Sequence, residues 1–285
     1  IRVAGLKQRM EIGAPAQGPE KIPSHELFNT LREGVADLVR RQYELLNQVM
    51  FPELTKAGVR FVQSHEWNAK QKEWLSQYFE EQVVPVLTPL TFDPSRPFPS
   101  ILNKSLNFIV RLHGRDAFGL RRHRGMVQAP RSLPRSIELP EHLSEPGEHN
   151  SVFLSSLIRV HVDRLFPGLK VDGCYQFRVT RNSDLYIDDE EVSDLVRALE
   201  GQLQASRYGA AVRIEIGHEC PEDLQEFLLD HFGLQEDDMY LVEGPVNLNR
   251  LSTVCGLTDR PELLYPSFTQ GMPDELLTDE DIFDV

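Results

Sequence analysis

Three arginine side chains have the chemistry and the spacing to bind phosphate: Arg178, Arg181 and Arg213. A guanidinium group is planar, keeps its charge, and can direct two parallel N–H donors at an oxyanion. The stretch 175–180 alternates apolar and polar residues with the period of a half-buried strand, so Arg178 is predicted to point away from the core. Arg181 follows in a polar turn. Two guanidinium groups there could grip phosphate, or they could form surface ion pairs.

Arg213 has the same outward phase as Arg178 in a second predicted strand, 212–216. Both side chains are therefore expected on one face of a sheet. In that arrangement Glu215 is their nearest neutralising partner, and a cross-strand ion pair would contribute at most about 1 kcal/mol. The alternative is an anion site, and both interpretations stay open from the residues alone.

Positive charge is concentrated in the stretch 111–135, which contains a single acidic residue, Asp116. We expect a protruding hairpin or loop there, which either binds an anion or forms ion pairs. Aromatic residues do not alternate with the arginines, which argues against recognition of single-stranded nucleic acid. The net charge of −14 argues against nucleic-acid binding in general. The arginines of this stretch are Arg111, Arg115, Arg121, Arg122, Arg124, Arg131 and Arg135.

Motifs for catalysis are absent from the sequence. Neither glycine-rich phosphate loop occurs, nor do the HExxH and GxSxG patterns. The nine histidines are scattered and no Cys/His cluster has metal spacing, so no catalytic residue and no metal ligand is predicted. The three cysteines lie far apart, as in a cytosolic protein with reduced thiols. No run approaches the ~18 apolar residues of a membrane span.

The predicted fold class is α+β, and residues 1–104 are expected to form a helical N-terminal domain. It comprises the end of a helix before Met10, a long helix capped by Ser24, and a further helix that ends near Val84, all packed on one another. Five prolines in 85–104 predict an ordered, extended connection rather than a helix or a central strand. The apolar stripe of the long helix is Phe28, Leu31, Val35, Leu38, Leu45 and Val49, interrupted at Gln42.

Residues 105–270 are expected to form a mixed α+β head domain, because strands and helices do not alternate regularly enough for a doubly wound sheet. Residues 271–285 are acidic, contain no basic residue, and are expected to begin a linker. The expected strands of the head are 105–112, 126–127, 175–180, 212–216 and 239–242, and the expected helices are 151–166, 188–207, 221–233 and 247–255.

Several stretches, taken in order, resemble the bacterial polyphosphate kinase family of the phosphohistidine type. They are IRVAGLKQRM, VVPVLTPLTFDPSRPFPSILNKSLNFIV, LFPG followed by FRVTRNSDL, VRIEI, and RPELLYPSFT. Together they cover nearly the whole chain. The resemblance implies a piece of a longer protein, comprising part of the N-terminal domain, whose first helices are missing, and the head domain.

The resemblance further implies a cytoplasmic enzyme, free or peripheral to a membrane, that reversibly transfers the terminal phosphate of ATP to inorganic polyphosphate through a phosphohistidine. Mg²⁺, ATP/ADP and polyphosphate are its expected cofactor and substrates, and the head domain is expected to form a homodimer. The family's catalytic residues lie outside this chain, so we expect this portion to position nucleotide and polyphosphate and to be inactive alone. The alternative is a stand-alone interaction module whose Arg-rich loop binds an acidic partner.

Overall fold

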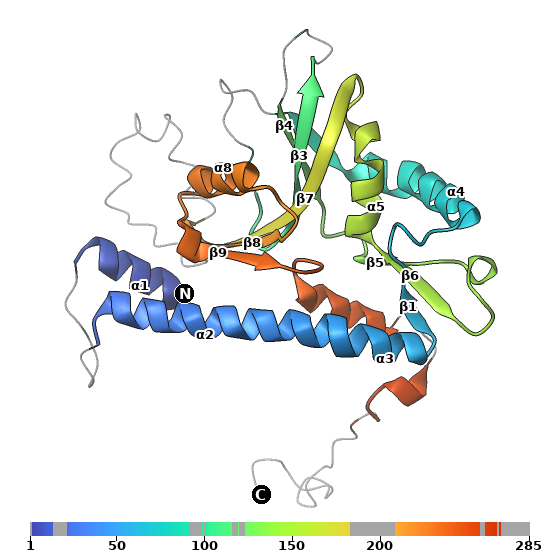
Figure 1. The fold of residues 1–285 in the computed structure, drawn as a ribbon, viewed down its shortest axis with the longest axis horizontal. Helices are drawn as coiled ribbons and strands as arrows, with labels where there is room; N and C mark the ends of the chain where they lie inside the picture. Colours follow the sequence, from blue (N-terminus) through green and yellow to red (C-terminus); the bar gives the residue numbers. More distant parts are fainter. Residues whose placement is uncertain are drawn as a thin grey trace, which may run out of the picture.

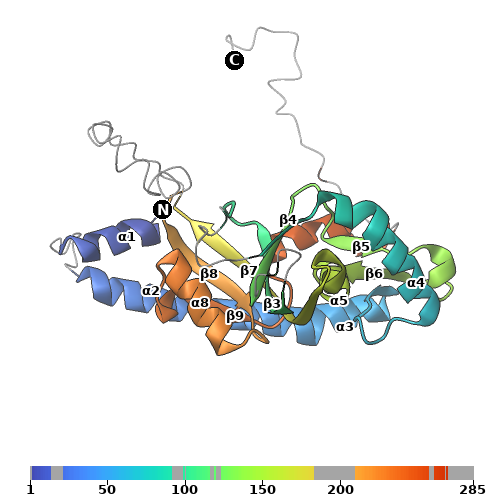
Figure 2. The same cartoon turned by 90° about the horizontal axis from the view of Figure 1, so that it is seen from above.

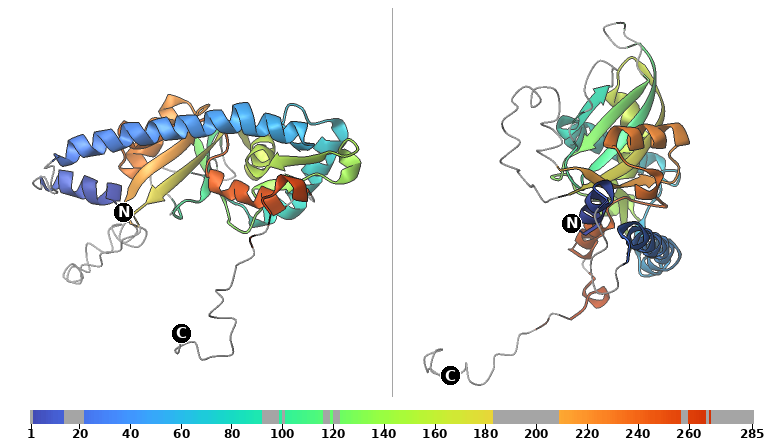
Figure 3. Two further views of the ribbon diagram at one scale, coloured as in Figure 1. Left: turned by 90° about the horizontal axis from the view of Figure 1, so that it is seen from below. Right: turned by 90° about the vertical axis from the view of Figure 1, so that its left-hand side faces the viewer.

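The computed structural model describes residues 2–13, 22–91, 99, 101–115, 119, 123–182, 209–256, 260–266 and 268. Its architecture is α+β, as predicted, with an elongated shape in which a long helix runs beside the sheets (Figures 1 and 3). The expected helix 188–207 and the acidic segment 271–285 lie outside the described residues. The helices are α1 (Arg2–Glu11), α2 (Ser24–Leu45), α3 (Phe51–Lys56), α4 (Ala69–Tyr78), α5 (Leu154–His161) and α8 (Glu222–Phe232).

A six-stranded sheet forms the centre of the molecule, with the strand order β2-β4-β3-β7-β8-β9. Neighbouring strands are antiparallel except β8 and β9, which are parallel and are joined through α8. The strands are β2 (Thr88–Thr91), β3 (Leu106–Gly114), β4 (Arg124–Ala129), β7 (Leu169–Arg181), β8 (Ala211–Gly217) and β9 (Met239–Val242). Strand β2, which contains Pro89, lies at an edge of the sheet, where a missing N–H donor is tolerated.

Helices cover both faces of this sheet, as Figure 2 shows. On one face, Phe177, Val179 and Ile216 pack with Leu224 and Leu228 of α8 in a continuous apolar cluster. The other face contributes Phe108 and Val110 of β3 to a larger cluster with α5 and with the π-helical turn η2 (Phe79–Val83) that extends α4. A residue that points away from the first cluster therefore points at a second layer of protein.

A second sheet joins distant parts of the chain in the order β1-β6-β5. Its strands are β1 (Val59–Phe61), β5 (Ser136–Glu138) and β6 (His149–Phe153). The predicted helix 151–166 starts too early: Ser151 lies within β6, opposite Phe61, and its carbonyl oxygen accepts a hydrogen bond from the Val62 N–H. Because its backbone belongs to the strand ladder, the helix begins only at Leu154.

Helix α2 packs against α1 and β9 rather than against α4. The Tyr43 hydroxyl donates to the carbonyl oxygen of Pro245 at 2.8 Å, and Lys7 of α1 forms an ion pair with Asp238. Gly244, with φ 154°, allows this approach: a Cβ there would lie 3.3 Å from the Tyr43 ring. The N-terminal helices therefore depend on the head for their packing.

The predicted stripe of α2 is only partly buried. Leu38 is 63% exposed and Leu45 is 53% exposed, whereas Tyr43 and Leu46 lie in the core. The helical spacing correctly identified an apolar face of α2. The core, however, packs against the adjacent face of the helix, which carries Tyr43. The predicted cap is also wrong, since Ser24 is the first helical residue and its hydroxyl has no hydrogen-bond partner.

The domain boundary at residue 104 remains a prediction, namely that residues 1–104 and 105–270 form two separate domains. In the structure, β1 and β2 come from the predicted N-terminal part, and each pairs with a strand of the predicted head. The apolar cluster that contains Tyr43 also contains Phe108 and Val246. These contacts cross the predicted boundary in both sheets.

Stability should fall at acidic pH because of His161. The side chain is buried and stacks on Phe79 with 5.0 Å between ring centroids, and burial lowers the pKa of His161. A folded-state pKa below the unfolded value of about 6.5 means that the unfolded chain takes up the proton first, so stability is lost as pH falls below that value. We expect a lower urea midpoint at pH 5 than at pH 7. The difference should shrink in His161→Phe and persist in the exposed-residue control His142→Phe.

Candidate functional site

Arg178 lies directly opposite Glu215 in the antiparallel β7–β8 ladder. Its Nη2 donates to Glu215 Oε1 at 2.7 Å, its Nε lies 2.6 Å from Oε2, and its Nη1 donates to Asn247 Oδ1 at 2.8 Å. The Arg178 side chain is 16% exposed and that of Glu215 is 7% exposed. Arg178 therefore points away from the apolar cluster of Phe177 and Val179, as predicted, but this face of the sheet is covered, so the cross-strand ion pair with Glu215 is buried rather than exposed.

Arg213 shares the same carboxylate, as its predicted phase required. Its Nη2 donates to Glu215 Oε1 at 2.5 Å, and its guanidinium carbon lies 4.0 Å from the centroid of the Tyr240 ring. Two guanidinium groups therefore meet one carboxylate, which leaves this group of three residues with one net positive charge. Tyr43 lies beside this group, and burial followed by the charge of Glu215 raises the pKa of its hydroxyl.

Arg181 lies apart from the other two arginines. Its Nε donates to the Ile101 carbonyl oxygen at 3.2 Å, its Nη1 donates to the Gly209 carbonyl oxygen at 3.0 Å, and the guanidinium lies 5.7 Å from the Phe232 ring centroid. Phe232 also packs with Phe177, so Arg181 belongs to the α8 face of the sheet. The structure brings Arg178 and Arg213 together and places Arg181 on the opposite face.

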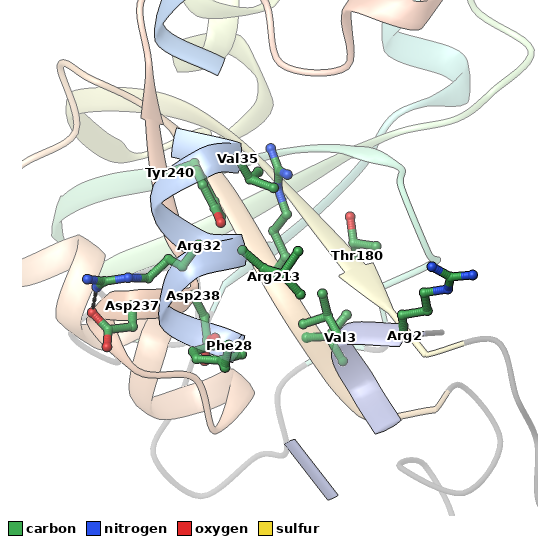
Figure 4. Close-up of a pocket in the computed structure, with 12 residues that line it drawn as sticks. Arg2, Val3, Phe28, Arg32, Val35, Thr180, Arg213, Asp237, Asp238 and Tyr240 are labelled. Carbon is green, nitrogen blue, oxygen red and sulfur yellow. Dashed lines mark hydrogen bonds and ion pairs between the residues drawn. The ribbon is translucent and has the colours of Figure 1, made fainter. Parts of the chain in front are cut away.

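A pocket of about 260 Å³ opens beside Arg213, between α1, α2 and the strands β7, β8 and β9 (Figure 4). Arg2, Arg32 and Arg213 contribute positive charge to it, and Phe28 and Tyr240 contribute aromatic rings. Asp237 forms an ion pair with Arg32, and Asp238 forms one with Lys7. The two carboxylates and Arg32 are thereby paired, and Arg2 and Arg213 remain to supply positive charge, so the pocket suits an anion that also has an apolar or aromatic part.

Sequence reasoning missed Tyr240 and Asn247. Tyr240 follows Met239 in a short strand, so the two side chains point to opposite faces of the sheet. This alternation could have indicated that Tyr240 shares a face with Arg213. Asn247 has φ 68°, a left-handed conformation that asparagine tolerates better than most residues. Nothing in its local sequence predicts that its amide accepts a hydrogen bond from Arg178.

The Arg-rich stretch forms the predicted hairpin of β3 and β4 and resolves into separate contacts. Arg111 forms an ion pair with Asp223, Arg124 lies 4.3 Å from the Phe227 ring centroid, and Arg131 donates to the Asn103 carbonyl oxygen. Arg121 and Arg122 lie outside the described residues. The stretch is thus no single anion-binding surface within the part of the chain that the structure describes.

Other reactive groups give no sign of a catalytic centre among the described residues. Cys174 and Cys220 are buried, and burial raises the pKa of each thiol to about 12, which suppresses the nucleophilic thiolate. No three His, Cys, Asp or Glu side chains in the described ranges gather as metal ligands. No described helix has the length and hydropathy needed to cross a bilayer.

The fold is that of a solved polyphosphate kinase. The crystal structure of the enzyme from Porphyromonas gingivalis superposes with a TM-score of 0.68 over 89% of this chain and 34% of that one, at 21% sequence identity. Sequence comparison matches residues 1–62 to the polyphosphate kinase N-terminal domain and residues 70–254 to the polyphosphate kinase middle domain. The chain belongs to the polyphosphate kinase family.

Relatives at higher identity bear the same name. The chain is 48% identical over its whole length to the polyphosphate kinase of Pseudomonas syringae pv. tomato and covers 39% of it. It is 44% identical to the polyphosphate kinase of Neisseria gonorrhoeae and covers 42% of that protein. The chain therefore spans about two fifths of the length of these relatives. This family membership favours the predicted kinase over the alternative of a stand-alone interaction module.

Proposed function

We propose that this chain is the N-terminal and head portion of an enzyme that reversibly transfers the terminal phosphate of ATP to inorganic polyphosphate through a phosphohistidine. The observation that supports it best is the match to two polyphosphate kinase domains in consecutive order along the chain. The portion supplies no catalytic residue, so purified alone it should make no polyphosphate from ATP. Turnover by the isolated 285-residue chain would contradict this division of roles.

Positive charge beside an aromatic pocket supports a role in holding substrate. ATP, ADP and polyphosphate all carry phosphoryl groups, which guanidinium groups bind through charge-assisted hydrogen bonds. Arg213 lines the pocket and lies over Tyr240, and Arg178 adjoins it through the shared Glu215. We propose that Arg178 and Arg213 contact phosphate on this face and that Arg181 does so from the opposite face.

Replacing Arg178, Arg181 and Arg213 together with alanine in the full-length enzyme should raise the KM for polyphosphate more than about tenfold, since one hydrogen bond to a charged group contributes about 1.5–3 kcal/mol. The effect on kcat should be smaller, because these residues bind rather than react. Initial rates across a polyphosphate series measure both constants.

A matched control removes the same charge elsewhere: Arg40, Arg41 and Arg164, all exposed and paired with surface acids, are replaced with alanine. This control should leave the KM within about twofold, because exposed ion pairs contribute little. Equal KM values in both triple variants would contradict the assignment. Thermal unfolding of each variant separates lost binding from lost folding.

The remaining features belong to the whole enzyme. We propose that it is a cytoplasmic, phosphohistidine-forming homodimer that associates through its head domains, with Mg²⁺ accompanying ATP. The described residues do not fit a Mg²⁺ site, since no three acidic or histidine ligands converge among them, so the ion would be held by other parts of the enzyme. Sedimentation of the full-length protein tests the dimer, and a protein that sediments as a monomer would contradict it.

A further inference from the structure

A second cavity, of about 20 Å³, lies between the first turn of α5, β7 and the 3-10 helix η9 (Leu248–Gly256). Its polar lining consists of Arg135, Ser155, Gln176, Asn247 and Arg250, and the rest of its lining is apolar. No Asp or Glu is among the lining residues. Two guanidinium groups thus share a cavity that contains no carboxylate.

Arg135 is the unusual member of this group. Its Nη1 is buried and has no hydrogen-bond partner, and no ion pair of Arg135 occurs within the described ranges. Burial, followed by the charges of Arg250 and Arg131, lowers the pKa of Arg135 to about 10. A buried charge without a partner destabilises a folded protein, so an occupant that supplies negative charge would offset this penalty.

The other polar side chains narrow the nature of the occupant. Gln176 is already engaged, because its Nε2 donates to the Gly244 carbonyl oxygen and its Oε1 accepts from the Val246 N–H. Asn247 accepts from Arg178. Ser155 lies in the first turn of α5, at the positive end of the helix dipole. Positively charged donors and a hydroxyl therefore face the cavity, which is the donor set of an oxyanion site.

The small volume of the cavity limits how much of an anion it can hold. About 20 Å³ holds one water-sized group, which corresponds to a single oxygen of a tetrahedral anion. Arg135 and Arg250 are both partly exposed as whole residues, although Nη1 of Arg135 is buried, so the cavity lies close to the protein surface. An anion whose remaining oxygens stay at the surface matches this shape, and a phosphoryl group within a chain or at its end has that geometry.

We propose that Arg135, Arg250 and Ser155 form a phosphoryl-binding site separate from the Arg213 pocket, with one phosphoryl oxygen in the cavity. The choice of phosphate among oxyanions rests on the proposed function, whereas the anion site rests on the cavity itself. Asn247 connects the two places, since it lines this cavity and binds Arg178. A polyphosphate chain or the phosphates of a nucleotide could supply the group.

Calorimetric titration of the 285-residue chain with tripolyphosphate, ATP, inorganic phosphate and sodium chloride tests the site. Arg135→Met should lower the affinity for the phosphate ligands at least about tenfold, since it removes a charged donor. Loss for tripolyphosphate alone would identify polyphosphate as the source, and loss for ATP alone would identify the nucleotide. Arg40→Met, at an exposed arginine paired with Asp37 and Glu44, should leave this binding within about twofold. Arg213→Met is titrated separately and reports on the Arg213 pocket, so unchanged affinity in Arg135→Met with a loss in Arg213→Met would overturn this site and leave the Arg213 assignment standing.

Thermal unfolding gives a second readout that a purely structural arginine would not produce. Without ligand, Arg135→Met should unfold at the same or a higher temperature than the parent chain, because an unpaired buried charge is removed. The rise in unfolding temperature with tripolyphosphate should be smaller than in the parent chain, because only the Arg213 pocket then remains to bind the ligand. Arg131→Met is the matched control, since Arg131 is exposed and donates to the Asn103 carbonyl oxygen outside the cavity.

Four results would overturn the site. The first is unchanged phosphate affinity in Arg135→Met, and the second is an equal loss in Arg131→Met, which would indicate diffuse attraction. The third is a lower unfolding temperature of Arg135→Met with its phosphate response retained, which would make Arg135 a structural residue. A response to chloride equal to that to phosphate at the same ionic strength would likewise reveal nonspecific screening.

Discussion

Replacing Glu215 with alanine should lower the free energy of unfolding by about 3–5 kcal/mol. The side chains of Glu215, Arg178 and Arg213 are 7%, 16% and 26% exposed, so the variant leaves two guanidinium groups in a poorly hydrated layer without their shared carboxylate. Removing one partner of a buried ionic group is far more damaging than removing an exposed one. Urea unfolding at neutral pH measures the loss.

The control for this prediction is Glu53→Ala, whose partner Lys56 is exposed. It should change the free energy of unfolding by less than about 1 kcal/mol. A loss of similar size in both variants would show that the sheet face is hydrated and that Glu215 is an ordinary surface acid. The double variant in which Arg178 and Glu215 both become methionine should recover part of the loss, because only Arg213, rather than two guanidinium groups, is then left without its carboxylate.

Phe177→Ala should destabilise the fold by about 3–5 kcal/mol through a different mechanism. Phe177 is fully buried, pairs in register with Asn107 on β3 and Ile216 on β8, and packs on Phe232 at 6.2 Å. Truncation removes apolar contact area and leaves a cavity in the middle of the sheet, where strands on both sides limit relaxation. Thermal and urea unfolding together give the change.

The variant Phe177→Leu distinguishes the effect of lost side-chain volume from the effect of the lost aromatic ring. It keeps most of the apolar side chain and should destabilise by less than about 1.5 kcal/mol. If alanine and leucine had equal effects, the ring contact with Phe232 rather than the cavity would be the source of the loss. The slope of the urea transition should stay unchanged, because neither substitution alters how much surface unfolding exposes.

Strand phase predicted much of this architecture from the sequence. The alternation around Phe177 and around Ile214 gave both strands and the shared face of Arg178 and Arg213, which the structure confirms. Arg181 was predicted to lie in a turn, but it is the last residue of β7. Had the strand alternation been extended to Arg181, it would have placed this side chain on the same face as Phe177. Period-two patterning fixes which residues share a face.

What covers each face is a long-range fact that local patterning does not contain. Arg178 alternates with apolar residues as a solvent-facing residue would, yet Asn247 accepts a hydrogen bond from it and Tyr43 of α2 lies close enough for its pKa to respond to the Arg178 charge. Helix α2 shows the same limit. Leu38 and Leu45 belong to its apolar stripe by helical spacing, yet both side chains are exposed. The cavity at Arg135 combines residues separated by more than 100 positions, so no motif could indicate it.

The packing of α2 on the far end of the chain has a consequence for synthesis on the ribosome. The Tyr43–Pro245 contact spans 202 residues, and the Lys7–Asp238 contact spans 231. At bacterial and eukaryotic elongation rates of about 5–20 residues per second, α2 emerges roughly 10–40 s before its partner strand exists. For that interval an amphipathic helix has no native surface to cover its apolar side. The nascent chain should therefore be a chaperone client until β9 has been made, and synthesis should be most prone to aggregation during that period.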